Sequence, residues 1–314
     1  MSQAKHHMKP MSRGSRRILF IISVIVFCAI VPLVILYANG YVYTSQTSTV
    51  TFTGGIYVRS SVSGSTLSID GTSIDTFGFF TGGIFTRDIV PGTHTVSVTR
   101  EGYLPWKKNI YVRASQVPTA TAFLVPDPLI KTEIPQLITE TVTAVSATSS
   151  TSTKSASTTP ASTTKPYPNP EYEVVIEALK KKSPLATSTS ALVRNSVSIW
   201  ADRDMAVASW TGDTDTIPGF MCIADTSTAS TSQGEICSTI VSIPIRAKVK
   251  FIDFAPGRND VLIVGTADTV FAVELDGRST RMMVPLYRGR APDTVIRSGT
   301  LYVKDGARLF TIQL

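Results

Sequence analysis

The sequence predicts an all-β ectodomain carried on one N-terminal transmembrane α-helix. Three observations lead to this fold class: an uncharged apolar run near the N-terminus, two blocks of short alternating strands with Gly and Pro at their turns, and a Ser/Thr-rich stretch between the blocks. Short strands separated by such turns are typical of all-β domains. The ectodomain therefore divides into a small N-terminal β-sandwich and a larger C-terminal β-domain.

The apolar run covers the 20 residues from Ile18 to Tyr37 and contains no charged side chain. At 1.5 Å per helical residue, about 20 residues cross the ~30 Å hydrocarbon core of a bilayer, so we predict a transmembrane helix over residues 18–38. One alternative is a signal peptide cleaved near Ala38-Asn39-Gly40, although its apolar stretch is usually only about 7 to 15 residues long. A buried core helix is the other alternative, and the length of the run disfavours it.

Basic residues precede the apolar run in a predicted cytoplasmic tail, residues 1–17: Lys5, Lys9, Arg13, Arg16 and Arg17. Since the first acidic residue is Asp70, the positive-inside rule places the N-terminus in the cytoplasm and the β-domains outside a cell membrane that is crossed once. The remaining 25 Lys and Arg residues nearly balance the 23 Asp and Glu residues, despite a net charge of +7. We therefore expect a lipid bilayer as partner and no nucleic acid, which would require a clustered basic face.

A first β block spans residues 54–126. Apolar residues alternate with polar ones in four places, at Ile56/Val58, Leu67/Ile69, Val96/Val98 and Ile110/Val112. Turn signals such as Asp70-Gly71 and Pro91-Gly92 separate them, because Gly accepts positive φ and Pro presets φ near −65°. This pattern predicts a small sandwich of half-buried strands.

Three motifs in this block, VSGSTLSIDG at 62–71, IVPGTHTVSV at 89–98 and EGY at 101–103, have the order and spacing found in PEGA domains. The block therefore resembles a PEGA domain, with Val62 and Ser65 departing from the motif that names the family. The resemblance implies a β-rich extracytoplasmic module of bacterial envelope proteins that acts in binding or as a spacer rather than in catalysis. The matching motif residues are Gly64, Asp70, Gly71, Pro91, Gly92, His94, Gly102 and Tyr103.

Two features of the block leave alternatives open. His94 is the only histidine outside the tail, and we expect a strand residue with a satisfied ring rather than a catalytic or ligand-binding group. The phenylalanines at 77, 79, 80 and 85 either fill the small core or form an exposed aromatic patch.

Residues 127–170 are predicted to form a disordered stalk. Between positions 139 and 164, 17 of 26 residues are Ser or Thr, which provide too little apolar surface to offset the entropy of ordering. A short helix is expected over residues 171–183, because Asn169 can cap it and Pro170 suits its first position. The alternative is a strand at 172–176 that joins the next domain.

The C-terminal block, residues 191–314, contains about eleven predicted short strands grouped as four, four and three. The unit at 249–277, with a Pro-Gly turn and an Asp-Gly hairpin, resembles a blade of a TolB- or WD40-like β-propeller. About three blades fit in this length, whereas closed propellers use about four to eight, so we expect a partial propeller-like β-domain. A compact sandwich or a ring completed by a second copy is the alternative. Open sheet edges would be covered by residues 171–193 or by self-association.

Two cysteines, Cys222 and Cys237, flank a Ser/Thr-rich loop and are expected to form a disulfide outside the membrane. Such a bridge would stabilise the fold by about 3 kcal/mol in the chain-entropy model. The alternative is two separate small apolar residues. Metal binding is disfavoured because no histidine or third cysteine lies nearby.

No catalytic or phosphate-binding motif is evident, and we expect no enzyme and no cofactor. The leading hypothesis is non-catalytic binding or scaffolding at the cell surface, with an envelope protein or glycan as partner and the stalk giving reach. One alternative is a glycan-processing hydrolase, which needs two opposed carboxylates. Its candidates, in the Trp-flanked turns from Trp200 to Thr216, are Asp202, Asp204, Asp213 and Asp215. The other alternative is a transmembrane sensor, which would need a cytoplasmic partner because the tail is short.

Overall fold

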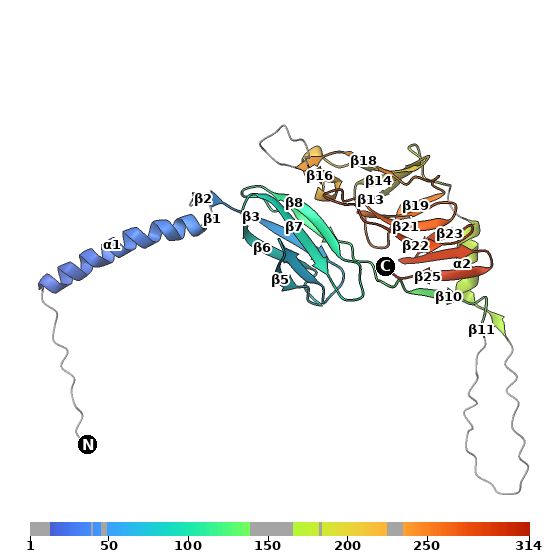
Figure 1. Cartoon of the computed structure of the whole chain (residues 1–314), viewed down its shortest axis with the longest axis horizontal. Coiled ribbons are helices and arrows are strands. Elements are labelled where there is room, and N and C mark those ends of the chain that lie inside the picture. Colours follow the sequence, from blue (N-terminus) through green and yellow to red (C-terminus); the bar gives the residue numbers. More distant parts are fainter. Residues whose placement is uncertain (1–12, 39, 45–48, 139–165, 182–183, 225–234) are drawn as a thin grey trace, which may run out of the picture.

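The computed structural model describes residues 13–38, 40–44, 49–138, 166–181, 184–224 and 235–314. In Figure 1 a single long helix, α1, projects from a body that is built almost entirely of antiparallel β-sheets. The predicted fold class, an all-β body on an N-terminal apolar helix, is therefore confirmed.

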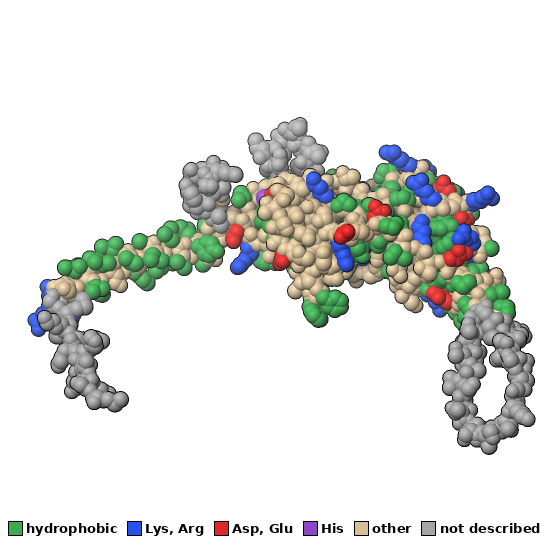
Figure 2. Space-filling model, turned by 60° about the horizontal axis from the view of Figure 1, so that its bottom comes forward, with side chains coloured by type: hydrophobic (Ala, Val, Ile, Leu, Met, Phe, Trp, Pro, Cys, Tyr) green, Lys and Arg blue, Asp and Glu red, His purple; other side chains and the backbone are tan. Residues whose placement is uncertain are grey.

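Helix α1 runs from Arg13 to Ala38, and none of its residues is buried against the rest of the described chain. The helix has 26 residues, and its most apolar 18-residue window has a mean hydropathy of 3.3. Hydrophobic side chains cover its length (Figure 2). These properties are those of a membrane-spanning helix. The helix begins within the predicted tail, so Arg13, Arg16 and Arg17 lie on its first turns. A hairpin of β1 (Tyr41–Thr44) and β2 (Thr49–Phe52) then leads to the first β-domain.

The first β-domain is a sandwich of two sheets. One sheet has the order β5-β4-β7-β8 and the other has the order β6-β3-β9, with β3 and β9 parallel. Alternate side chains of both sheets, including Ile56, Leu67 and Trp106, meet in a core from which water is excluded. The strand bounds are β3 Gly54–Ser60, β4 Thr66–Ile69, β5 Thr72–Thr76, β6 Gly83–Ile89, β7 Gly92–Thr99, β8 Trp106–Val112 and β9 Thr119–Ala122.

Three four-stranded sheets make up most of the second β-domain in the described part of the chain. The first sheet has the order β13-β14-β15-β18, the central sheet β19-β20-β21-β22, and the third sheet β10-β25-β24-β23. A separate hairpin of β16 and β17 follows two short 3-10 helices, Thr214–Thr216 and Gly219–Met221. The strand bounds are β10 Lys131–Ile134, β13 Leu192–Arg194, β14 Val197–Asp202, β15 Met205–Trp210, β16 Cys222–Ala224, β17 Glu235–Cys237, β18 Ile240–Pro244, β19 Phe251–Phe254, β20 Val261–Gly265, β21 Thr269–Glu274, β22 Met283–Arg288, β23 Asp293–Arg297, β24 Thr300–Asp305 and β25 Arg308–Ile312.

The central sheet is buried on both faces. All five residues of β20 are buried, as expected for a strand that reads as a continuous apolar run. Leu262 and Val264 pack toward the first sheet, whereas Val261 and Ile263 pack toward the third. The three sheets therefore stack as layers, and the central one holds the outer two together.

The prediction of a disordered stalk over residues 127–170 is wrong at both of its ends. Strand β10 pairs with β25 from the C-terminus and supplies the fourth strand of the third sheet. Next to it, β11 (Leu137–Ile138) pairs with β12 (Tyr167–Pro168). The Ser/Thr-rich residues 139–165 lie outside the described residues. Because the segments on either side of them are paired, this stretch does not separate the two β-domains.

Helix α2, Pro170–Lys180, lies where a short helix was expected. The side chain of Asn169 accepts a hydrogen bond from the Glu171 N–H at 3.0 Å and caps the helix. Helix α2 lies beside the third sheet (Figure 1). Tyr172, Val175 and Leu179 pack with Ile134, Tyr302 and Leu309 of that sheet, on the face that points away from the central sheet. Residues 171–193 thus do cover part of the domain, since α2 shields the third sheet and β13 extends the first.

Candidate functional site

The two β-domains meet in a buried interface centred on β8. Trp106 and Lys108 of this strand are almost fully buried, although Lys108 carries a charge. Its Nζ lies 2.7 Å from Oε2 of Glu274 on the central sheet and donates to the Asp276 carbonyl at 2.9 Å. The indole N–H of Trp106 donates to the other Glu274 oxygen at 2.7 Å. A lysine and a carboxylate from different domains are thus buried together as an ion pair.

Burial raises the pKa of the Glu274 carboxyl above its ordinary value. The nearby charge of Lys108 and the hydrogen bonds from Lys108 and Trp106 oppose this effect, because they favour the ionised form. Removing Lys108 would therefore leave a buried carboxylate without the cation that compensates it.

Two arginines of the second domain cover the edge of strand β9. Arg278 forms a two-pronged ion pair with Asp276, with a shortest distance of 2.8 Å, and donates to the Thr119 carbonyl at 3.2 Å. Arg258 pairs with Asp260 at 2.6 Å and donates to the carbonyls of Thr121 and Ala122. Strand β9 lies at the edge of its sheet, where unpaired carbonyls would otherwise face solvent. These bonds fix the two domains as one body.

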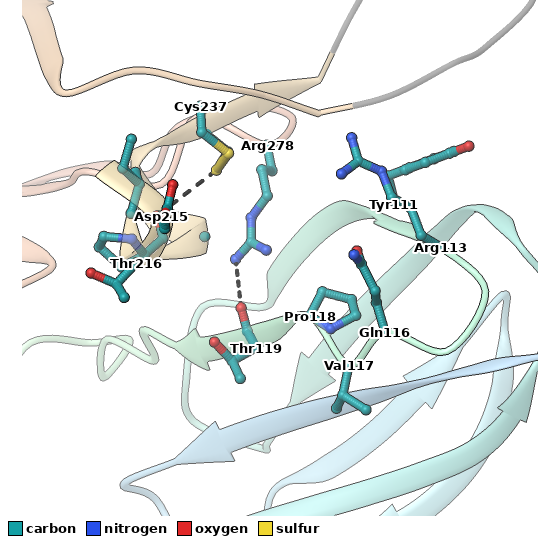
Figure 3. A pocket seen from close by; sticks show the side chains of 14 residues that line it. Tyr111, Arg113, Gln116, Val117, Pro118, Thr119, Asp215, Thr216, Cys237 and Arg278 are labelled. Carbon is teal, nitrogen blue, oxygen red and sulfur yellow. Dashed lines mark hydrogen bonds between the residues drawn. A yellow bond between two sulfur atoms is a disulfide. The ribbon is translucent and has the colours of Figure 1, made fainter. Parts of the chain in front are cut away.

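A cleft of about 600 Å³ opens beside this interface. Figure 3 shows Tyr111, Arg113 and Gln116 of the first domain on one side, with Asp215 and Thr216 of the second domain across from them. Arg278 lies between the two groups and forms the floor with Thr119. Arg113 and Asp215 are exposed, and Tyr111 is half-buried. The walls therefore present a cation, an anion, an amide, hydroxyls and an aromatic ring to one space.

The disulfide between Cys222 and Cys237 is confirmed, and it borders this cleft. The two cysteines lie directly opposite each other on β16 and β17. The bridge closes the hairpin that follows the 3-10 helix at Gly219–Met221, which lines the same cleft. It therefore holds the wall of the second domain in place.

The turn motifs of the first domain form a compact structural cluster. Asp70 and Gly71 both have positive φ, 51° and 81°, as a two-residue hairpin loop between β4 and β5 requires. The Asp70 carboxylate accepts hydrogen bonds from the Thr95 N–H at 2.8 Å and pairs with the His94 ring at 2.6 Å. The second ring nitrogen of His94 lies 2.7 Å from the Val90 carbonyl. His94 therefore links two turns.

The remaining motif residues also lie at turns. Gly64, Gly92 and Gly102 have positive φ, Pro91 precedes β7, and Tyr103 forms an isolated bridge with Pro126.

The family model of the PEGA domain matches residues 53–127. This range agrees within one residue with the β block predicted from the sequence, so the first β-domain is a PEGA domain. Among solved structures, the chain is similar to a Bacteroides fragilis protein of unknown function that is described only as a candidate membrane-associated protein. The identity is 11%, the coverage is 83% of this chain and 98% of the other, and the TM-score is 0.19. No curated protein matches the chain.

A pH titration tests the Asp70 cluster of the PEGA domain. Burial alone would raise the pKa of Asp70, but the bonds from His94 and Thr95 outweigh it and lower the pKa below 3.8. Because the native pKa is below the unfolded one, the cluster stabilises the fold above about pH 4 and loses this effect as the pH falls through the native pKa. In Asp70→Asn, we expect lower stability at neutral pH and a shallower loss in acid, measured by urea unfolding from pH 2 to 7. If the free energy of unfolding depends on pH in the same way in Asp70→Asn and in the parent protein, this role of Asp70 is contradicted.

The four candidate carboxylates do not meet at one site. Asp202 and Asp204 flank the turn between β14 and β15, whereas Asp213 and Asp215 lie before and within the first 3-10 helix. All four are exposed, and only Asp215 lines the cleft. Within the described ranges, no group of three or more His, Cys, Asp or Glu residues has the arrangement of a metal site. At this cleft the hydrolase alternative therefore has one of its four candidate carboxylates, Asp215.

The PEGA-domain phenylalanines separate into two groups. Phe77 is buried in the sandwich core, with 1% of its surface exposed. Phe79 and Phe80 form an edge-to-face pair on the loop before β6 and are 84% and 94% exposed, and Phe85 is half exposed. Of the two alternatives that the sequence left open, burial in the core therefore applies to Phe77, and exposure on the surface applies to Phe79, Phe80 and Phe85.

Sequence reasoning missed the interface residues Trp106, Lys108 and Glu274. A signal was present at Lys108, which shares the period-two face of Trp106, Ile110 and Val112 and so occupies an inward-facing position. A lysine at such a position requires a buried partner. Nothing in the sequence indicated that Glu274, 166 residues later, provides it.

Proposed function

We propose that this protein is anchored in the bacterial cell membrane by α1 and acts outside the cytoplasm by non-catalytic binding or scaffolding. The observation that carries this proposal is the buried Lys108–Glu274 interface, which joins the PEGA domain and the second domain into one body with a cleft between them. Small-ligand sites are commonly found at domain interfaces and have volumes of about 300–1,000 Å³. Binding therefore involves both domains together, rather than a distal domain held away on a stalk.

The second β-domain in this proposal is an open, propeller-like stack of three blades. Each sheet is a four-stranded antiparallel unit, and the third takes strand β10 from an earlier part of the chain. Each of the three sheets ends in edge strands, β18 and β22 among them, through which copies can associate. An envelope protein or glycan is the partner of the cleft.

Protease treatment of intact cells tests the topology. With an epitope tag after Leu314, we expect external protease to remove the tag without lysis, because the C-terminal domain lies outside the membrane. A tag that is cut only after lysis would contradict the proposal. The same cells carrying a tag before Met1 provide the control, since that tag must remain protected.

Filling the cleft tests the binding function. The full-length protein in lipid nanodiscs should bind isolated cell envelopes in a saturable manner. The variant Thr216→Trp, which places an indole in the cleft, should reduce this binding at least about tenfold, the loss expected when a ligand is sterically excluded. The matched control is Thr214→Trp, an exposed position two residues away that does not line the cleft. Equal binding by the two variants would contradict a role for the cleft.

A further inference from the structure

The charges of the cleft determine what kind of ligand it can hold. Three ionisable side chains that carry charge line it, and Asp276 already compensates the charge of Arg278 at 2.8 Å. Arg113 and Asp215 remain as exposed and opposite charges on facing walls. Their electrostatic potentials have opposite sign and partly cancel in the space between the walls, so a simple anion or cation gains little there. The cleft therefore suits a ligand without net charge that both donates and accepts hydrogen bonds.

The hydrogen-bonding groups of the cleft match a hydroxyl-rich ligand. Arg113 donates only, Asp215 accepts only, and Gln116, Thr119 and Thr216 do both. Each hydroxyl of a sugar both donates and accepts, so adjacent hydroxyls can be bound by a planar guanidinium on one wall and a carboxylate on the other. Tyr111 adds an aromatic ring to the wall of the PEGA domain, with the Arg113 guanidinium 6.0 Å from its centroid. The ring gives the apolar face of a sugar a surface on which to pack.

We infer that the cleft binds a neutral oligosaccharide, with Arg113 and Asp215 holding its hydroxyls from the two domains. This inference deepens the proposed function and rests on it, since it names the class of ligand for the same cleft. It also gives a role to the buried interface: because Arg113 and Asp215 belong to different domains, their separation is fixed only while the domains are held together.

Direct binding measurements test the inference. Full-length protein in nanodiscs is titrated with neutral oligosaccharides released from the cell's own envelope, and with tetragalacturonate and tetra-alanine as carboxylated and peptide probes. We expect binding of the neutral sugars that changes less than about threefold between about 50 and 500 mM salt, because no net ion pairing is involved. Arg113→Ala and Asp215→Asn should each weaken it at least about tenfold.

Matched variants control for general effects of lost charge. Arg87→Ala removes an exposed arginine of the PEGA domain outside the cleft, and Asp213→Asn neutralises an exposed carboxylate two residues from Asp215. Both should bind within about twofold of the parent, as is usual for surface substitutions away from a site. Circular dichroism and unfolding midpoints establish that all four variants are folded.

Three outcomes would overturn the inference. The first is that tetragalacturonate or tetra-alanine binds more tightly than any neutral sugar. The second is that neutral sugars still bind to both Arg113→Ala and Asp215→Asn. The third is that the protein retains no sugar. If envelope binding still depends on Thr216 while no sugar is retained, the ligand class is wrong but the binding function stands. If envelope binding is also absent, both fail.

Discussion

Replacing Lys108 with alanine should destabilise the folded protein by about 3–5 kcal/mol, because Glu274 would be left as a buried charge without its partner. The side chains of both residues are at most 1% exposed, so water cannot replace the lost ammonium group without opening the interface. Urea unfolding of the full-length protein, followed by tryptophan fluorescence, measures the change. Trp106 lies within this interface and reports on it directly.

The neighbouring residue provides a matched control for this substitution. Lys107 lies on the same strand but is exposed, so Lys107→Ala should change the free energy of unfolding by no more than about 0.5 kcal/mol. The double variant Lys108→Met, Glu274→Gln should recover most of the loss, because neutral side chains of similar volume can replace a buried ion pair. Similar stabilities for the Lys107 and Lys108 variants would show that the domains do not depend on this pair.

Replacing Ile134 with alanine should destabilise the second domain by about 2–5 kcal/mol. Ile134 lies on β10, is 6% exposed and packs against Tyr172 and Val175 of α2. If this segment were part of a disordered stalk, the substitution would have no effect on stability. Thermal unfolding followed by circular dichroism therefore distinguishes a strand of the third sheet from a spacer.

The control for Ile134 is the same residue type four positions earlier. Ile130 precedes β10 and is 51% exposed, so Ile130→Ala should be nearly neutral. A loss of stability at both positions would indicate that the substitutions act through the unfolded chain or through local backbone effects. No loss of stability at either position would indicate that residues 127–138 belong to a disordered stalk.

Local patterns predicted much of this fold because they depend on neighbouring residues. The period-two alternation of Val96 and Val98, the Asp70-Gly71 turn and the apolar run at Ile18–Tyr37 each reflect the conformation of a single segment. The pairing of β10 with β25 could not be predicted in the same way. It joins residues that lie about 180 positions apart, such as Lys131 and Ile312. Nothing in a polar strand of four residues indicates which distant strand it pairs with.

The cleft illustrates the same limit. Asp215 was identified as a candidate because it is an acid in a Trp-flanked stretch, but its nearness to Arg113 depends on how two domains dock. Charged side chains at Lys108, Arg258 and Arg278 bond across this docking interface to groups that lie 136 or more positions away in the sequence. A basic residue is usually exposed, so nothing at Arg258 or Arg278 indicates an interface, and the inward-facing position of Lys108 does not identify its partner.

Because β11 pairs with β12 in antiparallel orientation, the chain can be cut between these two strands without separating its two pieces. Leu137 lies opposite Pro168, and Ile138 lies opposite Tyr167, so the chain leaves and rejoins the domain at neighbouring points. A single cut between positions 139 and 165 would therefore yield two fragments that remain associated, the first supplying β10 to the sheet of the second. The C-terminal fragment would stay attached to the membrane through non-covalent contacts alone. Because the entropy of closing a loop rises only slowly with its length, insertions at this point should also leave the rest of the protein unchanged.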